Sequence, residues 1–66
     1  MIFQYEYARR GSVVSVDVFA GSDPEALDFS GTMVFGEAAF MAFKDLLLLV
    51  EEWTGDEIFF VDLDKS

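Results

Sequence analysis

Residues 36–55 have the sequence GEAAFMAFKDLLLLVEEWTG, and the architecture of the chain follows from this segment. Apolar side chains recur along it at spacings of three and four, which is the period of a helix with one buried face. A glycine stands just outside each end, and Glu37 suits the positive N-terminal end of a helix dipole. We therefore predict a helix over about residues 37–53. Its core face is expected to carry six apolar side chains: Ala39, Phe40, Phe43, Leu46, Leu47 and Val50.

The residues before this helix alternate with the two-residue period of strands. We predict strands near residues 2–8, 13–20 and 27–34, with the first two joined as a hairpin through residues 9–12, where Gly11 allows a positive φ. Gly31 on the inward face would leave room for a bulky side chain of the helix. The side chains expected to point inward are Phe3, Tyr5, Tyr7, Val14, Val16, Val18, Leu27, Phe29 and Met33.

A last strand is expected at about residues 57–63, with Phe59, Val61 and Leu63 inward. The order of elements is then β-β-β-α-β, and a right-handed crossover returns the last strand parallel to the first. This predicts an α+β protein with a mostly antiparallel four-stranded sheet in the order 4-1-2-3 and one helix packed on one face. The 66 residues, 53% hydrophobic with eight phenylalanines, are enough for one compact domain over residues 1–66.

The composition lacks the residue types on which most catalytic mechanisms depend. The chain has no histidine and no cysteine, which are the commonest general base and the strongest common nucleophile. Asp62 and Asp64 share one side of the last strand, but no segment has the regular oxygen spacing of a calcium loop, and no glycine motif predicts a phosphate site. We expect a protein that is not an enzyme, with no catalytic residues, no metal site and no cofactor.

The expected location is the cytoplasm. Absence of cysteine fits a reducing compartment, and the first residues lack the basic and apolar segments of a secretory signal. The longest apolar stretch, residues 38–50, is interrupted by Lys44 and Asp45 and is too short to cross a bilayer. These features predict a soluble cytoplasmic protein.

Charge is the strongest indication of function. The chain carries thirteen carboxylates against four basic residues, for a net charge of −9. Between Gly11 and Asp64 the only basic residue is Lys44. Such a surface repels nucleic acids and anionic membranes and attracts basic partners. We therefore expect no direct contact with nucleic acid or membrane, and binding to a basic protein, most simply one that itself binds nucleic acid.

Two surfaces could make that contact. Alternation places carboxylates and hydroxyls on the sheet face opposite the helix, with no lysine among them: Gln4, Glu6, Ser15, Asp17, Asp28, Ser30, Thr32 and Asp62. On the far side of the helix, Met41 and Leu48 form an apolar stripe bordered by Glu37, Asp45 and Glu52. The candidate partner-binding residues are Glu6, Asp17, Asp28, Glu37, Met41, Asp45, Leu48, Glu52 and Asp62.

In size, acidity and lack of catalytic residue types, the chain is similar to the class of small phage-encoded antagonists of bacterial defence, such as anti-CRISPR and anti-restriction proteins. That similarity implies an inhibitor whose carboxylates stand in for phosphates on a basic surface, acting in the host cytoplasm if a phage encodes it. An immunity protein that neutralises a basic toxin uses the same physics. A homodimeric structural or assembly module, joined through the helix stripe or an edge strand, is the other alternative.

Overall fold

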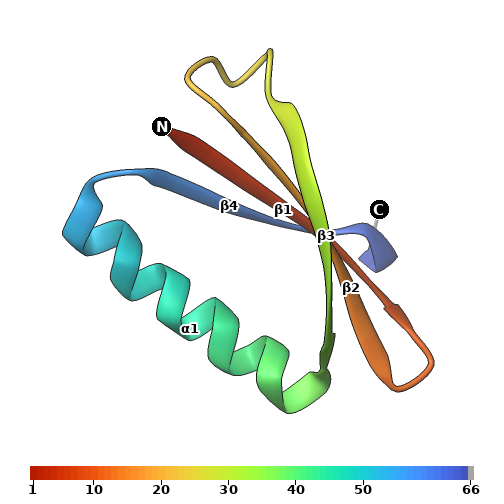
Figure 1. Cartoon of the computed structure of the whole chain (residues 1–66). Helices are drawn as coiled ribbons and strands as arrows, with labels where there is room; N and C mark the ends of the chain where they lie inside the picture. The colour runs from red at the N-terminus through yellow and green to blue at the C-terminus, as the bar shows by residue number, and fades with distance from the viewer. Residues whose placement is uncertain (66) are drawn as a thin grey trace.

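The structure is a computed structural model of the chain, and it describes residues 1–65, so that Ser66 of the expected domain lies outside the described part. The chain folds into four strands and one long helix and ends, after the last strand, in a short 3-10 turn. Figure 1 shows how these elements are arranged. The elements are β1 (Ile2–Arg10), β2 (Val13–Gly21), β3 (Asp28–Gly36), α1 (Glu37–Thr54), β4 (Glu57–Asp62) and the turn Leu63–Lys65.

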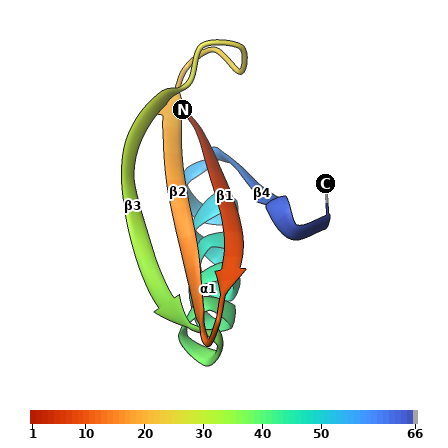
Figure 2. The same cartoon turned by 90° about the vertical axis from the view of Figure 1, so that its right-hand side faces the viewer.

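The four strands form one mixed sheet in the order β3-β2-β1-β4. β2 pairs antiparallel with β1 and with β3, whereas β4 pairs parallel with β1. The predicted order and the parallel closure are confirmed. Figure 2 looks at the sheet with α1 behind it, so one face of the sheet is covered by the helix and the other is not. We call the side opposite the helix the open face.

Glycines set the two sharpest reversals of the chain. Arg10 pairs with Val13, so the β1–β2 hairpin has a two-residue loop, tighter than the predicted four-residue connection. Gly11 at its first position has φ 64°, which fits a type II′ turn. Gly55 ends α1 with φ 76°, and its N–H donates to the Glu51 carbonyl at 3.0 Å.

The core lies between α1 and the inward sides of β1 and β2. Phe40, Val14 and Val16 are fully buried, and Tyr7 packs on Phe40 with 4.8 Å between ring centroids. Phe35 stacks on Phe43, also at 4.8 Å. Burying one such side chain is worth about 1.5–3 kcal/mol, so these contacts fix how the helix lies on the sheet. The predicted inward sides of β1 and β2 are confirmed.

The predicted inward side of β4 was wrong. Ile58 and Phe60 face the helix, because they pair with the inward residues Phe3 and Tyr5 of β1. Phe59, Val61 and Leu63 are instead exposed. The segment from Ile58 to Val61 is apolar on both sides, so alternation could not decide which side is buried, and the register with β1 decides it.

A bulge overturns the prediction for the first half of β3. Val18 pairs with Gly31 and Phe19 with Phe29, so Ser30 is the extra residue. Phe29 therefore joins Phe19 on the open face, where it is exposed. Leu27 also lies over this face, since its Cδ2 is 3.2 Å from where a side chain at Gly21 would begin. Met33, beyond the bulge, faces the core as predicted.

The core face of α1 is also rotated from the predicted one. Phe40, Phe43 and Leu47 pack inward, but Ala39 and Leu46 are exposed. Lys44 lies inward instead, with its Nζ 5.4 Å from the ring centroids of Tyr7 and Phe60. The run Leu46–Val50 is apolar on every side, so its hydrophobic pattern did not define one face.

Candidate functional site

The centre of the open face carries two carboxylates that meet across neighbouring strands. Glu6 of β1 pairs in register with Asp17 of β2. Asp17 pairs in turn with Thr32 of β3, and Glu6 with Val61 of β4. We call Glu6 and Asp17 the acid pair. Both were predicted for this face, and the structure brings them side by side.

Neutral donors, not cations, hold the acid pair. The Gln4 Nε2 donates to Glu6 Oε2 at 2.7 Å, and the Thr32 Oγ1 donates to Asp17 Oδ1 at 2.7 Å. Within residues 1–65, no ion pair reaches either carboxylate. Like charges directly opposite on neighbouring strands destabilise a sheet. The acid pair is therefore a feature that folding alone does not explain.

Apolar side chains surround the acid pair on the same face. In the adjacent row, Phe29 and Phe19 form an edge-on pair at 5.6 Å between centroids, and Phe59 lies at the far end beyond Gln4. Phe29 is 60% exposed and Phe59 49%. The open face is thus not the purely polar face that alternation predicted. An arginine combines a charged, planar guanidinium with an apolar stem. On this face the guanidinium could contact the acid pair and the stem could contact the phenylalanines.

Two of the predicted acids lie on the other side of the sheet. Asp62 pairs with the core residue Tyr7, so it faces the helix side, and its Oδ1 accepts from the Asp64 N–H at 3.0 Å. Asp28 pairs with Ala20 and alternates with Phe29, which also places it away from the open face. Asp62 differs from the prediction because pairing with β1 determines which side of β4 faces the helix. Asp28 differs because the bulge in β3 reverses the sides of the residues before it.

The predicted helix stripe is exposed as expected. Met41, Asp45, Leu48 and Glu52 lie along one side of α1, and none of them is covered by the sheet. Sequence reasoning missed three side chains that are at least as exposed: Leu46, Leu49 and Trp53. The spacings of three and four between them were readable, but they competed with equally regular apolar series on the same helix.

Among the acids of α1, only Glu37 forms an ion pair within residues 1–65. The Arg9 guanidinium donates to both of its carboxylate oxygens, at 2.8 and 3.1 Å. This hydrogen bonding lowers the pKa of Glu37 and raises the pKa of Arg9. The Arg9 N–H donates to Asp64 at 2.8 Å, and Arg10 lies 3.7 Å from the same carboxylate. Both arginines thus bind carboxylates near the end of β1, and neither neutralises the negative charge of the acid pair.

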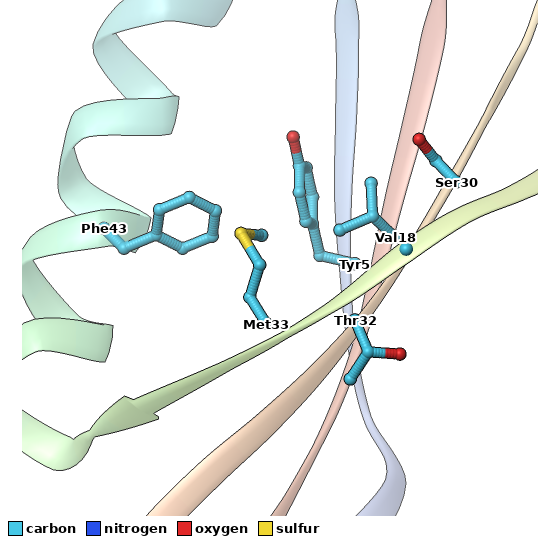
Figure 3. Close-up of a pocket in the computed structure, with 7 residues that line it drawn as sticks. Tyr5, Val18, Ser30, Thr32, Met33 and Phe43 are labelled. Atoms are coloured by element: carbon cyan, nitrogen blue, oxygen red, sulfur yellow. The ribbon is translucent and has the colours of Figure 1, made fainter.

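A hollow of about 390 Å³ lies between α1 and the strands β2 and β3 (Figure 3). Tyr5, Val18, Met33 and Phe43 line it, and nothing lies within 4 Å of where a side chain on Gly31 would begin. The space that Gly31 was predicted to leave for a helix aromatic therefore stays partly open. Burial raises the pKa of Tyr5 above its ordinary value. The lining holds hydroxyls and apolar groups but no carboxylate or ammonium.

Comparison with protein-family models, with curated proteins and with solved structures gives no match to this chain. Within residues 1–65, no three carboxylates gather as a metal site would require. In the same residues, no helix has both the length and the apolar character needed to cross a membrane. The open face with its acid pair is therefore the candidate site that the geometry itself distinguishes.

Proposed function

We propose that this chain is a non-enzymatic inhibitor that binds a basic surface of a partner protein through the open face of its sheet. The partner surface is one that otherwise holds nucleic acid, and the setting is the cytoplasm, as for phage antagonists of bacterial defence. Carboxylates of the chain take the place of phosphates, and its net charge of −9 speeds the encounter.

The acid pair is the observation that carries this proposal. Two carboxylates face each other without a cation, although the chain has arginines that could have been placed beside them. An incoming guanidinium would relieve their repulsion and gain charge-assisted hydrogen bonds. The surrounding phenylalanines would cover its stem and exclude water, which is the arrangement of an interface centre.

The wider charge distribution supports the same proposal. The ion pairs within residues 1–65 engage only three of the thirteen carboxylates, those of Glu37, Asp56 and Asp64. Lys44 lies over aromatic rings on the helix side and not among the acids of the open face. Arg10 lies at the end of β1 on the open-face side, but its guanidinium is 3.7 Å from the Asp64 carboxylate, so no ion pair within residues 1–65 neutralises the acid pair at the centre of this face.

Affinity capture from a bacterial lysate tests the proposal when three baits are compared. The first is the natural chain, the second carries Glu6→Gln and Asp17→Asn, and the third carries Asp45→Asn and Glu52→Gln. The two variants lose the same charge, one from the open face and one from the helix. We expect the natural chain and the helix variant to capture a nucleic-acid-binding protein, which salt elutes and duplex DNA displaces.

The acid-pair variant should lose this capture. Equal loss with both variants would show that net charge alone is responsible and would contradict the assignment to the open face. Loss confined to the helix variant would move the site to the stripe of Met41 and Leu48. Capture that ignores both ionic strength and DNA would contradict the whole proposal.

A further inference from the structure

The outer side of α1 carries an apolar stripe that the monomer does not use. Its members follow one another at spacings of three, four, three and four, and all are exposed: Ala39, Ala42, Leu46, Leu49 and Trp53. Trp53 is 82% exposed and Leu46 58%. This spacing is that of the seam between two packed helices. We call these five residues the outer stripe.

The stripe is graded in size along the helix. Its N-terminal half is made of alanines, and its C-terminal half ends in leucine and the only tryptophan of the chain. Two copies packed antiparallel place Trp53 against Ala39 of the partner subunit and Leu49 against Ala42 of the partner subunit. Leu46 then meets Leu46 of the partner subunit on the two-fold axis. Large side chains fill the space above small ones in every layer except this central one.

We propose that the chain forms an antiparallel homodimer through the outer stripe of α1. This inference is independent of the proposed inhibitor function. Because α1 covers one face of the sheet, as Figures 1 and 2 show, such a dimer leaves both open faces directed outward. Dimerisation and binding of a basic partner can therefore occur together.

The available area is enough for a weak but specific dimer. An aromatic side chain buries about 150–250 Å², and the exposed parts of Trp53, Leu46, Leu49 and the two alanines together present roughly 500 Å² per copy. Two copies would bury at most about 1,000 Å², which is the lower limit for a specific interface. We therefore expect a weak dimer that dissociates on dilution.

Charge favours the antiparallel arrangement over the parallel one. The last turn of α1 has no basic residue and contains Glu51 and Glu52 close to the negative end of the helix dipole. An antiparallel partner brings its positive helix N-terminus beside this end, and the acidic Glu37 in that first turn is neutralised by its ion pair with Arg9. Asp45 flanks the centre of the stripe, where it meets Asp45 of the partner subunit. Salt should therefore strengthen the dimer, which is the opposite of its expected effect on a basic partner.

Light scattering and tryptophan fluorescence over a dilution series test the dimer. We expect the mass to rise from one chain to two with concentration, while the emission of Trp53 shifts to the blue as the dimer buries it. Leu49→Ser should weaken dimerisation at least about tenfold. Leu48→Ser is the matched control, because Leu48 and Leu49 are 50% and 51% exposed but only Leu49 lies in the stripe. Leu48→Ser should leave the mass curve unchanged.

Cysteine cross-linking tests the orientation, and the natural chain contributes no cysteine of its own. Leu46→Cys should form a disulfide between copies on mild oxidation, whereas Ala39→Cys should not, since its neighbour is Trp53 of the partner subunit. Efficient cross-linking of both variants would overturn the antiparallel arrangement. A single-chain mass at all concentrations with unchanged emission would overturn the dimer, as would equal effects of Leu48→Ser and Leu49→Ser.

Discussion

At the scale of single residues, the acid pair shows a conflict between folding and binding. Glu6 and Asp17 are adjacent in the sheet, and each is held by a neutral donor within 2.7 Å. A glutamine or asparagine at either position would keep the hydrogen-bonding shape and remove the repulsion. The presence of two carboxylates therefore indicates a requirement other than stability.

We expect Glu6→Gln to stabilise the fold while weakening capture of a basic partner. Relief of a like-charge cross-strand pair is worth about 0.2–1 kcal/mol. Thermal unfolding at low salt should show a higher Tm for the variant, by up to several degrees. Ser15→Ala, a change on the same face that leaves charge unaltered, is the control. A lower Tm for Glu6→Gln would mean that Gln4 and its neighbours already stabilise the charge.

At the scale of elements, the buried side could be predicted from the sequence where an element has a single apolar side. The prediction was wrong where an element is apolar on more than one side. The sides of β1 and β2, the span of α1 and the parallel return of β4 were all predictable from period and connection. β4 and the middle of α1 are apolar on every side. The buried side of β4 is determined by its pairing with β1, and that of α1 by the packing of Lys44 over aromatic rings. The bulge at Ser30 could not be predicted from the alternation of apolar and polar residues in β3.

These errors explain how much of the candidate site could be predicted. Glu6 and Asp17 lie on strands with clean alternation, so both were placed on the correct face. Two of the phenylalanines beside them, Phe29 and Phe59, lie on the two strands whose sides were predicted wrongly, so the face is mixed and not polar as predicted. Asp28 and Asp62 moved to the other side with the same two strands.

The ion pair between Arg9 and Glu37 joins the end of β1 to the start of α1, and it predicts a pH dependence. Hydrogen bonding to Arg9 lowers the folded pKa of Glu37 below its ordinary 4.5. The stabilisation is thus present above the unfolded pKa and is lost as pH falls through the folded pKa. We expect Glu37→Gln to have a lower Tm than the natural chain at pH 7, with the difference disappearing in acid.

Thermal unfolding from pH 7 down to pH 3 measures this dependence. Asp23→Asn provides a control, since Asp23 lies in an exposed turn without an ion pair. A difference between Glu37→Gln and the natural chain that persists in strong acid would show that packing, rather than the charge of Glu37, links the two elements.

At the scale of the whole molecule, a net charge of −9 on 66 residues opposes the compact state. Screening by salt reduces this repulsion, so we expect the Tm to rise between low and moderate sodium chloride. The measurement uses Leu49→Ser, so that dimerisation does not contribute to the change. A Tm that is flat or falling over this range would show that the carboxylates are too dispersed to repel one another.

Titration with a guanidinium probe tests whether the acid pair of the open face binds basic side chains. A nona-arginine peptide titrated into the isotopically labelled chain should shift the backbone amide signals of Gln4, Glu6, Asp17 and Thr32 first, with the effect abolished by Glu6→Gln combined with Asp17→Asn. Shifts that follow acidic residues indiscriminately, or that centre on Asp23 and Glu25 and survive the double substitution, would contradict a binding site at the acid pair.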